Sequence, residues 1–414
     1  MSRHKLSRRE QRQAKTEARK LLRSPHFFKK YLRAVRKAGL VGEEQNALVL
    51  LIVEVSRILD RPLNAFVKGH SSSGKNWLVT RGFRLMPKSA VVELTSTSDK
   101  AWNYSRSDFR HRVLYLQEQN DAAGAIDPIR NFISEGKLIR RVAEFENRKR
   151  VAKEHIAYGP IAAISTTTKN RLKIDDETRH ISIWVDESPQ QTLQIVQSYT
   201  KSKHLNQKEL KTWHEVHREL EKVVGAKVIF PEWFDEVPKH LFHASVSVRR
   251  YYPAFVEACR TVCLIRSFHG YRKPSEHGHL EVEFADFAIT ALIFDPVFVE
   301  SLHLGKGGAE DTRRGVEDIF AKKERPVGAK DLARALRISM DQAYSKLSYA
   351  ARVGVIRRAN KPEKGNRKLF LPTPRPRFVP DPEELFKELK AIRDKCRFVH
   401  PITGKWIVYR RERD

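Results

Sequence analysis

The chain has 414 residues, enough for two or three domains, and 79 Lys and Arg against 50 Asp and Glu give a formal net charge of +29. Such a basic surface favours a polyanionic partner, most often nucleic acid, over a basic protein without one or a patch that meets acidic lipid. Three cysteines exclude a disulfide framework and favour the reducing cytoplasm, and the longest apolar run, Ala47 to Val53, is too short to cross a membrane.

In the N-terminal half, residues 1–24 are polar and basic with few apolar anchors, which predicts a weakly ordered basic arm. Apolar residues at helical spacing predict a helical segment over 25–62. Short apolar runs then alternate with helical stretches over 63–189, a pattern typical of an α/β core with a parallel sheet and helices on both faces. The predicted strands are 63–68, 90–94, 113–116, one within 156–166, and 180–185.

The C-terminal half is predicted to be helical over 190–304, and 309–372 has the order helix, helix, turn, helix, basic hairpin. This order looks like a winged helix-turn-helix that binds DNA, with a winged helix used only for protein contacts as the alternative. A tail over 373–414 is predicted to contain a helix over 381–396 and a strand over 406–409. The candidate DNA contacts are Gln342 and Lys346 on the second helix and Arg357, Arg358, Lys364, Arg367 and Lys368 in the hairpin.

A glycine-rich segment joins the first predicted strand to the next helix with the spacing Gly69-x-x-x-x-Gly74-Lys75, which is typical of a P-loop. Backbone N–H groups and the helix N-terminus would hold phosphate oxygens, and Lys75 would reach the outer phosphates. The alternative is a glycine turn without a ligand. The candidate nucleotide contacts are Gly69, Ser71, Ser72, Ser73, Gly74, Lys75 and Asn76. Because Asn76 stands where Ser or Thr usually binds Mg²⁺, metal affinity is the weaker part of the prediction.

Polar residues end the later predicted strands. Gln117 and Glu118 end the third, where acidic residues of P-loop ATPases hold Mg²⁺ and polarise the attacking water. Glu118 fits the second role, with an ordinary loop carboxylate as the alternative, and Gln117 is a weak metal ligand. Threonines around Thr167 end the next strand; they can sense the terminal phosphate, or they are there because threonine favours strands. Arg179, before the last strand, can reach a neighbouring subunit's triphosphate.

Several motif blocks occur in a fixed order: Gly42-Glu43-Glu44-Gln45-Asn46, the P-loop, Val113-Leu-Tyr-Leu-x-Glu118, Glu177-Thr178-Arg179, Asp186-Glu187-Ser188-Pro189 and Val248-Arg249-Arg250. The order resembles the AAA+ module of MCM-like helicases of bacterial mobile elements and phages, often joined to primase-type domains, over about residues 20 to 300.

The resemblance implies a self-assembling ring, a hexamer, with ATP and Mg²⁺ at the subunit interfaces and residues 190–304 as a helical lid. It implies that Lys75 is the Walker A lysine, Glu118 the Walker B glutamate and Thr167 the sensor-1 residue. Arg179 looks like an arginine finger acting in trans, and Arg249 or Arg250 like the sensor-2 arginine.

A basic segment with Arg148, Lys149 and Arg150 resembles the tip of the hairpin that such ATPases project into the ring channel, with a solvated charge run as the alternative. The leading hypothesis is therefore an ATP-dependent DNA motor that translocates on or unwinds DNA, with other replication proteins as partners. A second hypothesis is an ATP-gated DNA-binding or loading protein with weak or no hydrolysis. The third is a regulator acting through the winged helix alone.

Overall fold

A computed structural model describes residues 7–94, 108–117, 132–146, 149–169, 172, 179–200, 204–241, 248–270, 272, 278–301, 309–352, 355–359, 368–372, 377–389, 392 and 395–411. Contacts divide the chain into two compact units. The first comprises Met1–Asp235, Arg250–Phe294 and Pro382–Asp414, and the second comprises Glu236–Arg249 and Asp295–Asp381.

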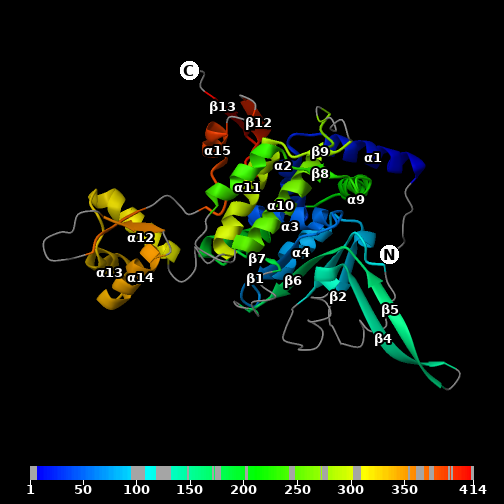
Figure 1. The fold of residues 1–414 in the computed structure, drawn as a ribbon, viewed down its shortest axis with the longest axis horizontal. Coiled ribbons are helices and arrows are strands. Elements are labelled where there is room, and N and C mark those ends of the chain that lie inside the picture. The colour runs from blue at the N-terminus through cyan, green and yellow to red at the C-terminus, as the bar shows by residue number, and fades with distance from the viewer. Residues whose placement is uncertain are drawn as a thin grey trace. The chain divides into compact units, whose positions relative to one another are not determined.

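The helices and strands follow one another as labelled in Figure 1. The α-helices are α1 (Arg8–Leu22), α2 (Phe27–Lys37), α3 (Glu44–Ser56), α4 (Lys75–Phe83), α8 (Pro189–Ser198), α9 (Gln207–Glu221), α10 (Val248–Arg266), α11 (Phe284–Ser301), α12 (Ala309–Lys323), α13 (Ala329–Leu336), α14 (Met340–Arg352) and α15 (Pro382–Glu388), with short 3₁₀ helices at Lys88–Ala90 and Glu232–His240. The strands are β1 (Asn64–Lys68), β2 (Val91–Leu94), β3 (Arg112–Leu116), β4 (Lys137–Glu146), β5 (Lys149–Tyr158), β6 (Ile161–Thr167), β7 (Ile181–Trp184), β8 (Val228–Ile229), β9 (Leu280–Glu281), β10 (Ile356–Arg358), β11 (Phe370–Pro372), β12 (Lys395–Val399) and β13 (Trp406–Arg410).

A five-stranded parallel sheet forms the centre of the first unit, in the order β2-β3-β6-β1-β7. All five strands fall within two residues of the predicted ranges or inside them, because each is a short apolar run between turns. β1 lies between β6 and β7, so the loop that follows β1 leaves from the interior of the sheet. The predicted fold class, α/β with a parallel sheet, is confirmed.

Helix α3 packs against both the sheet and α4, the helix that follows the glycine loop. It is apolar on nearly all sides, and residues 47–56 are buried. It contacts β1 and β6 as well as α2 and α4. A helix that is apolar all round is stable only when it is enclosed on all sides, and that is its position here.

Residues predicted as a weakly ordered basic arm form α1, so that prediction is wrong over 8–22. Ser7 and Glu10 form a reciprocal capping box at its N-terminus. A narrow stripe of Ala14, Ala18 and Leu22 is buried, and α1 packs against α9. The small size of these side chains hid the stripe in the sequence.

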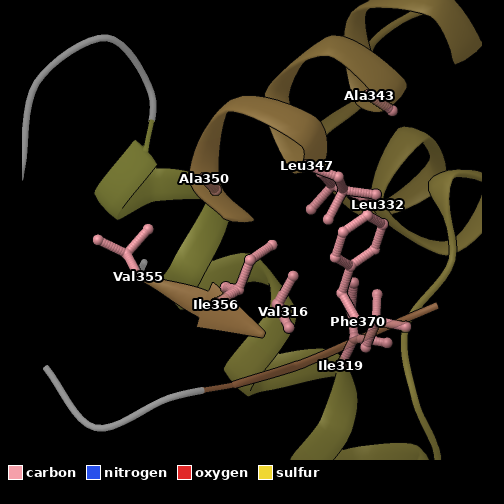
Figure 2. Packing of buried hydrophobic residues seen from close by; sticks show 10 residues of the cluster. Val316, Ile319, Leu332, Ala343, Leu347, Ala350, Val355, Ile356 and Phe370 are labelled. Carbon is pink, nitrogen blue, oxygen red and sulfur yellow. The ribbon is translucent and has the colours of Figure 1, made fainter. Parts of the chain in front are cut away.

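The second unit contains α12, α13 and α14, followed by β10 and β11, which pair antiparallel. A bridge between Val327 and Phe370 adds a third short extended segment. The core of this unit is apolar: Figure 2 shows Phe370 directed toward Leu332 and Leu347, beside Ile319. The order of helices and strands is the predicted one, and its interpretation as a winged helix remains a prediction.

The tail differs from its prediction in one respect. The helix predicted over 381–396 ends at Glu388, and Cys396 lies in strand β12. The strand predicted over 406–409 is confirmed as β13, which pairs antiparallel with β12. Cys396 faces Tyr409 in the pair, and both side chains are buried, so burial of alternate residues selects strand over helix here.

Candidate functional site

The segment Gly69–Gly74 joins the end of β1 to the N-terminus of α4, the placement that the P-loop prediction requires. Gly74 has φ 91°, a conformation that disfavours side chains, and nothing lies within 4 Å of where its Cβ would be. Gly69 is crowded instead: a Cβ there would lie 2.5 Å from Val185 and 2.6 Å from the Ser73 hydroxyl. The turn therefore needs both glycines, one for its backbone angle and one for close packing.

Lys75 lies at the first position of α4 and is 6% exposed. Its Nζ donates hydrogen bonds to the carbonyl oxygens of Gly69, at 3.0 Å, and His70. The ammonium group thus lies inside the turn. Ser73 Oγ is also buried, without a hydrogen-bond partner among the described residues. A buried hydroxyl with no partner is costly, and a phosphate oxygen is one group that would satisfy it.

Asn76, the next residue of α4, is already engaged. Its Oδ1 accepts a hydrogen bond from the Tyr115 hydroxyl at 3.1 Å. Tyr115 lies on β3 and is 2% exposed, and its ring packs edge-on against Phe83 at 5.3 Å. The amide oxygen predicted to approach Mg²⁺ is therefore held by a fixed neighbour.

Gln117 directly follows β3, and its backbone N–H donates to the Leu94 carbonyl at 3.2 Å. Glu118, the predicted water-polarising residue, lies outside the described residues. Within the described part of the chain, no group of three or more His, Cys, Asp or Glu side chains could hold a metal ion. Mg²⁺ commonly takes one or two protein carboxylates plus phosphate oxygens and waters.

Thr167 ends β6, where it pairs in register with Lys68, the last residue of β1. It is 1% exposed, and its hydroxyl accepts a hydrogen bond from the Lys169 N–H at 3.1 Å. β3, β6 and β1 are adjacent and parallel, so Gln117, Thr167 and the glycine turn share the carboxyl edge of the sheet. Ligands of open α/β sheets bind at this edge, where the strand order reverses.

Two acidic residues near the turn received no predicted role, although both belong to quoted motif blocks. Glu187 accepts a hydrogen bond from the His70 N–H at 2.6 Å and a second from the His70 ring. Burial alone would raise the pKa of Glu187, but these bonds from His70 outweigh burial and lower it. Glu43 accepts from the Asp186 N–H at 2.6 Å and bonds Asn46. Burial raises the pKa of Glu43.

The residue predicted as the arginine finger, Arg179, and one candidate for the sensor-2 arginine, Arg250, lie away from the glycine turn. Arg179 and Arg250 line one surface pocket of about 180 Å³, together with Arg61, Pro62, Leu63, Asn64, His180, Ile181, Tyr251, Pro253, Ala254 and Glu257. The pocket adjoins the amino ends of β1 and β7, which is the edge opposite the glycine turn. Arg179 donates to the Ser134 hydroxyl. Arg249 is exposed in the first turn of α10.

β4 and β5 form the hairpin predicted from the basic segment, with ten-residue strands paired from Lys137↔Tyr158 to Glu146↔Lys149. Lys149 and Arg150 begin β5, and Figure 1 shows β4 and β5 as two long arrows side by side. Arg148 lies outside the described residues. The hairpin therefore ends in the basic segment.

In the second unit, Gln342 lies in the first turn of α14 and forms a reciprocal cap with Ser339, with both bonds at 3.2 Å. Its carbonyl oxygen thus already has a structural partner. Lys346 is half-buried on the same helix, and Arg357 and Arg358 are exposed on β10. Lys368 Nζ lies 5.6 Å from the centre of the exposed Tyr344 ring. Lys364 and Arg367 lie outside the described residues.

The fold and the glycine turn define an α/β protein whose central parallel sheet carries a P-loop-like turn at its carboxyl edge. The sequence matches no protein-family model, and no curated protein matches it. Among the described residues, no helix is long and apolar enough to span a bilayer.

Solved structures similar to the chain include a full-length MCM homologue from Methanopyrus kandleri, at 10% identity and TM-score 0.42 over 73% of this chain and 63% of that one. The C-terminal region of NrS-1 (apo A form) aligns at 12% identity and TM-score 0.28 over 84% and 75%. The Aeropyrum pernix ORC1 protein in complex with DNA aligns at 10% and 0.27 over 84% and 93%. The chain spans less than two thirds of the M. kandleri homologue, and scores this low assign neither family nor function.

Proposed function

We propose that the chain is an ATP-dependent DNA motor, an AAA+ ring protein of the MCM-like type that translocates on or unwinds DNA in the replication of a mobile element or phage. The observation that carries the proposal is the position of two arginines. Arg179 and Arg250 share a pocket at the amino edge of the sheet, whereas Lys75 lies at the carboxyl edge.

The length of β1 separates the two edges. Its five residues span about 16 Å at the usual strand rise. Arg179 and Arg250 thus lie at the edge of the sheet opposite the glycine turn of their own chain. An arginine supplied to a nucleotide by a neighbouring subunit stabilises the charge of phosphoryl transfer. In this proposal Lys75 binds the phosphates within one subunit, and Arg179 and Arg250 act on the next.

Self-assembly has a candidate surface in α8. Leu193, Val196 and Tyr199 are 57%, 59% and 83% exposed, at spacings of three residues along the end of this helix. Exposed apolar side chains that align on one helix face favour a protein interface. α8 starts at Pro189, two residues after Glu187, which contacts the glycine turn. A second copy of the chain covering this stripe would bring its own residues close to the nucleotide.

The decisive test mixes two inactive variants. We expect Lys75→Ala and Arg179→Ala each to lose DNA-stimulated ATPase activity. Equimolar mixtures should regain part of it, because some interfaces then combine an intact Lys75 with an intact Arg179. Arg218→Ala serves as the control, since Arg218 is an exposed arginine of α9 whose ion pair among the described residues is with Glu215, three residues away. A mixture as inactive as its components, with both variants still assembling, would contradict action in trans.

A second function is favoured by the bond between Tyr115 and Asn76: an ATP-gated DNA-binding or loading protein with slow hydrolysis. An amide oxygen that already accepts a hydrogen bond at 3.1 Å binds Mg²⁺ weakly. ATPase rates over a Mg²⁺ series separate the two functions. A motor gives a high rate in the wild-type protein, whereas a loader gives a low rate that Asn76→Ser raises.

A further inference from the structure

The C-terminal hairpin β12–β13 has two chemically different faces. Alternate residues point inward, where Cys396, Phe398 and Tyr409 are buried. The Tyr409 ring lies 5.8 Å from that of Phe386 in α15 and 6.4 Å from that of Phe284 in α11. These contacts lie within the first unit and fix the hairpin as a rigid support for its outer face.

The hairpin is also tied to the N-terminal region at its turn. Lys29 of α2 donates a hydrogen bond from Nζ to the Ile402 carbonyl at 2.6 Å. The side chain of Lys29 packs against Gly404, where a Cβ would come within 3.1 Å of it. His26 meets the Trp406 ring edge-on, with centroids 5.8 Å apart. The turn is therefore held in place, and the outer face has a defined geometry.

The outer face is basic. Residues 395–411 contain five Lys and Arg and no Asp or Glu. Lys395 and Arg410 lie opposite one another at one end of the pair, and Arg397 lies opposite Val408. Lys395, Arg397, Lys405 and Arg410 are exposed, and none forms an ion pair with a carboxylate of the described residues. Paired like charges destabilise a hairpin, so an anionic partner would relieve a standing repulsion.

An aromatic surface lies among these charges. Trp406 is 45% exposed, and the guanidinium carbon of Arg397 lies 3.8 Å from the centre of its ring. The guanidinium and indole planes form a stack of the kind on which nucleic-acid bases lie, and neighbouring cations follow the phosphates. The base faces are free only in a single strand, since stacking within a duplex hides them.

We infer that the outer face of β12–β13, formed by Lys395, Arg397, Trp406, Val408 and Arg410, is a binding surface for single-stranded nucleic acid. It rests on the DNA-binding part of the proposed function and needs neither nucleotide nor ring assembly. Charge complementarity favours this partner over an apolar protein surface or a neutral membrane. The surface extends DNA contact beyond the hairpin β4–β5 and the second unit.

The test measures binding of a fluorescent oligo(dT) of about 20 nucleotides to the full chain without ATP. Trp406→Ala should weaken binding about fivefold or more, the loss typical of one stacked base, while Trp406→Phe stays close to wild type. Arg397→Ala should reduce the slope of log affinity against log salt by about 0.7, the change expected for one phosphate contact to a single strand. Lys239→Ala, an exposed lysine paired with Glu236, should change neither quantity.

Further arms separate the alternatives. The Trp406→Ala substitution should reduce the affinity of the protein for a duplex of equal length less than it reduces the affinity for oligo(dT). The Lys75→Ala variant should bind oligo(dT) as the wild type does, whatever happens to its ATPase activity. Unchanged oligo(dT) binding by both Trp406→Ala and Arg397→Ala overturns the inference. The inference is also overturned if the variants lose equal affinity for duplex and single-stranded DNA. It is overturned as well if they lose affinity only for vesicles of phosphatidylserine and phosphatidylcholine. Trp406→Phe and Arg397→Ala leave the inner face of the hairpin intact. If Trp406→Ala misfolds, oligo(dT) binding by Arg397→Ala still tests the inference.

Discussion

Helix α3 carries a buried carboxyl group, and its charge state should control the stability of the first unit. Glu54 of α3 is fully buried, and neither of its carboxyl oxygens has a hydrogen-bond partner among the described residues. Burial raises the pKa of Glu54 to about 8, against a smaller opposing effect of Arg57. Tyr31 of α2 and Gly82 of α4 lie close to Glu54. The pKa of Tyr31 is raised mainly by burial and to a smaller extent by the charge of Glu54.

The sign of the effect follows from proton linkage. The folded pKa of about 8 lies above the ordinary value of 4.5, so the folded state holds this proton more tightly than the unfolded state. Its contribution to stability is complete below pH 4.5 and is lost as the pH rises toward 8. At about 1.4 kcal/mol per pKa unit, the loss between about pH 5 and about pH 8 is about 3 to 4 kcal/mol, a large part of a typical folding free energy.

Glu54→Gln keeps the shape of the neutral carboxyl group and removes its titration. The assay is urea unfolding of wild type and variant at both pH values, followed by tryptophan fluorescence. The stability of the variant relative to wild type should rise by about 3 to 4 kcal/mol from the lower to the higher pH, and other titrating groups cancel in this difference. Glu17→Gln is the control, since Lys20 lowers the pKa of this exposed residue of α1. A relative stability of Glu54→Gln that does not change with pH would refute a buried neutral carboxyl group.

Three further substitutions test individual contacts: one beside Glu54, one in the glycine turn and one in the second unit. Gly82→Ala places a Cβ 2.5 Å from Glu54 Oε1 and should lower the free energy of unfolding by about 1–3 kcal/mol in thermal melts; an unchanged melting temperature would contradict this packing. Gly69→Ala should weaken ATP binding in calorimetry at least about tenfold, because its Cβ would collide with Val185 and Ser73, and wild-type affinity would count against the turn as the site. Ser339→Ala removes the cap of α14 and should cost about 1 kcal/mol in urea unfolding; no loss would show that the cap adds nothing.

The sequence predicts the sheet better than it predicts the helices around it. Each parallel strand is a continuous apolar run bounded by turns, so its position follows from composition. α1 shows the opposite case. Its capping residues Ser7 and Glu10 are readable in the sequence, but its buried stripe consists mainly of alanines, and only its packing on α9 makes them part of a core. The strand around Cys396 was missed for a related reason, because pairing with β13 decides it.

At the candidate site, the sequence identifies the types of residue present, whereas the structure shows which of their atoms already form hydrogen bonds. The spacing of Gly69, Gly74 and Lys75 predicts the turn. It does not predict that Tyr115 would hold the Asn76 amide, because that bond depends on how β3 lies beside α4. The contact between Glu187 and His70 is hidden in the same way, since 117 positions separate them.

The two edges of the sheet explain why the candidate residues cannot all serve one nucleotide within one chain. In a parallel sheet every strand begins at one edge and ends at the other, so residues that precede strands and residues that follow them are kept apart by the strand length. Arg179 precedes β7, and Lys75 follows β1, which pairs with β7 in register. The two side chains therefore start from opposite edges of the sheet. A second copy of the chain can place its arginine beside the nucleotide of the first copy. The proposed function therefore requires assembly for catalysis.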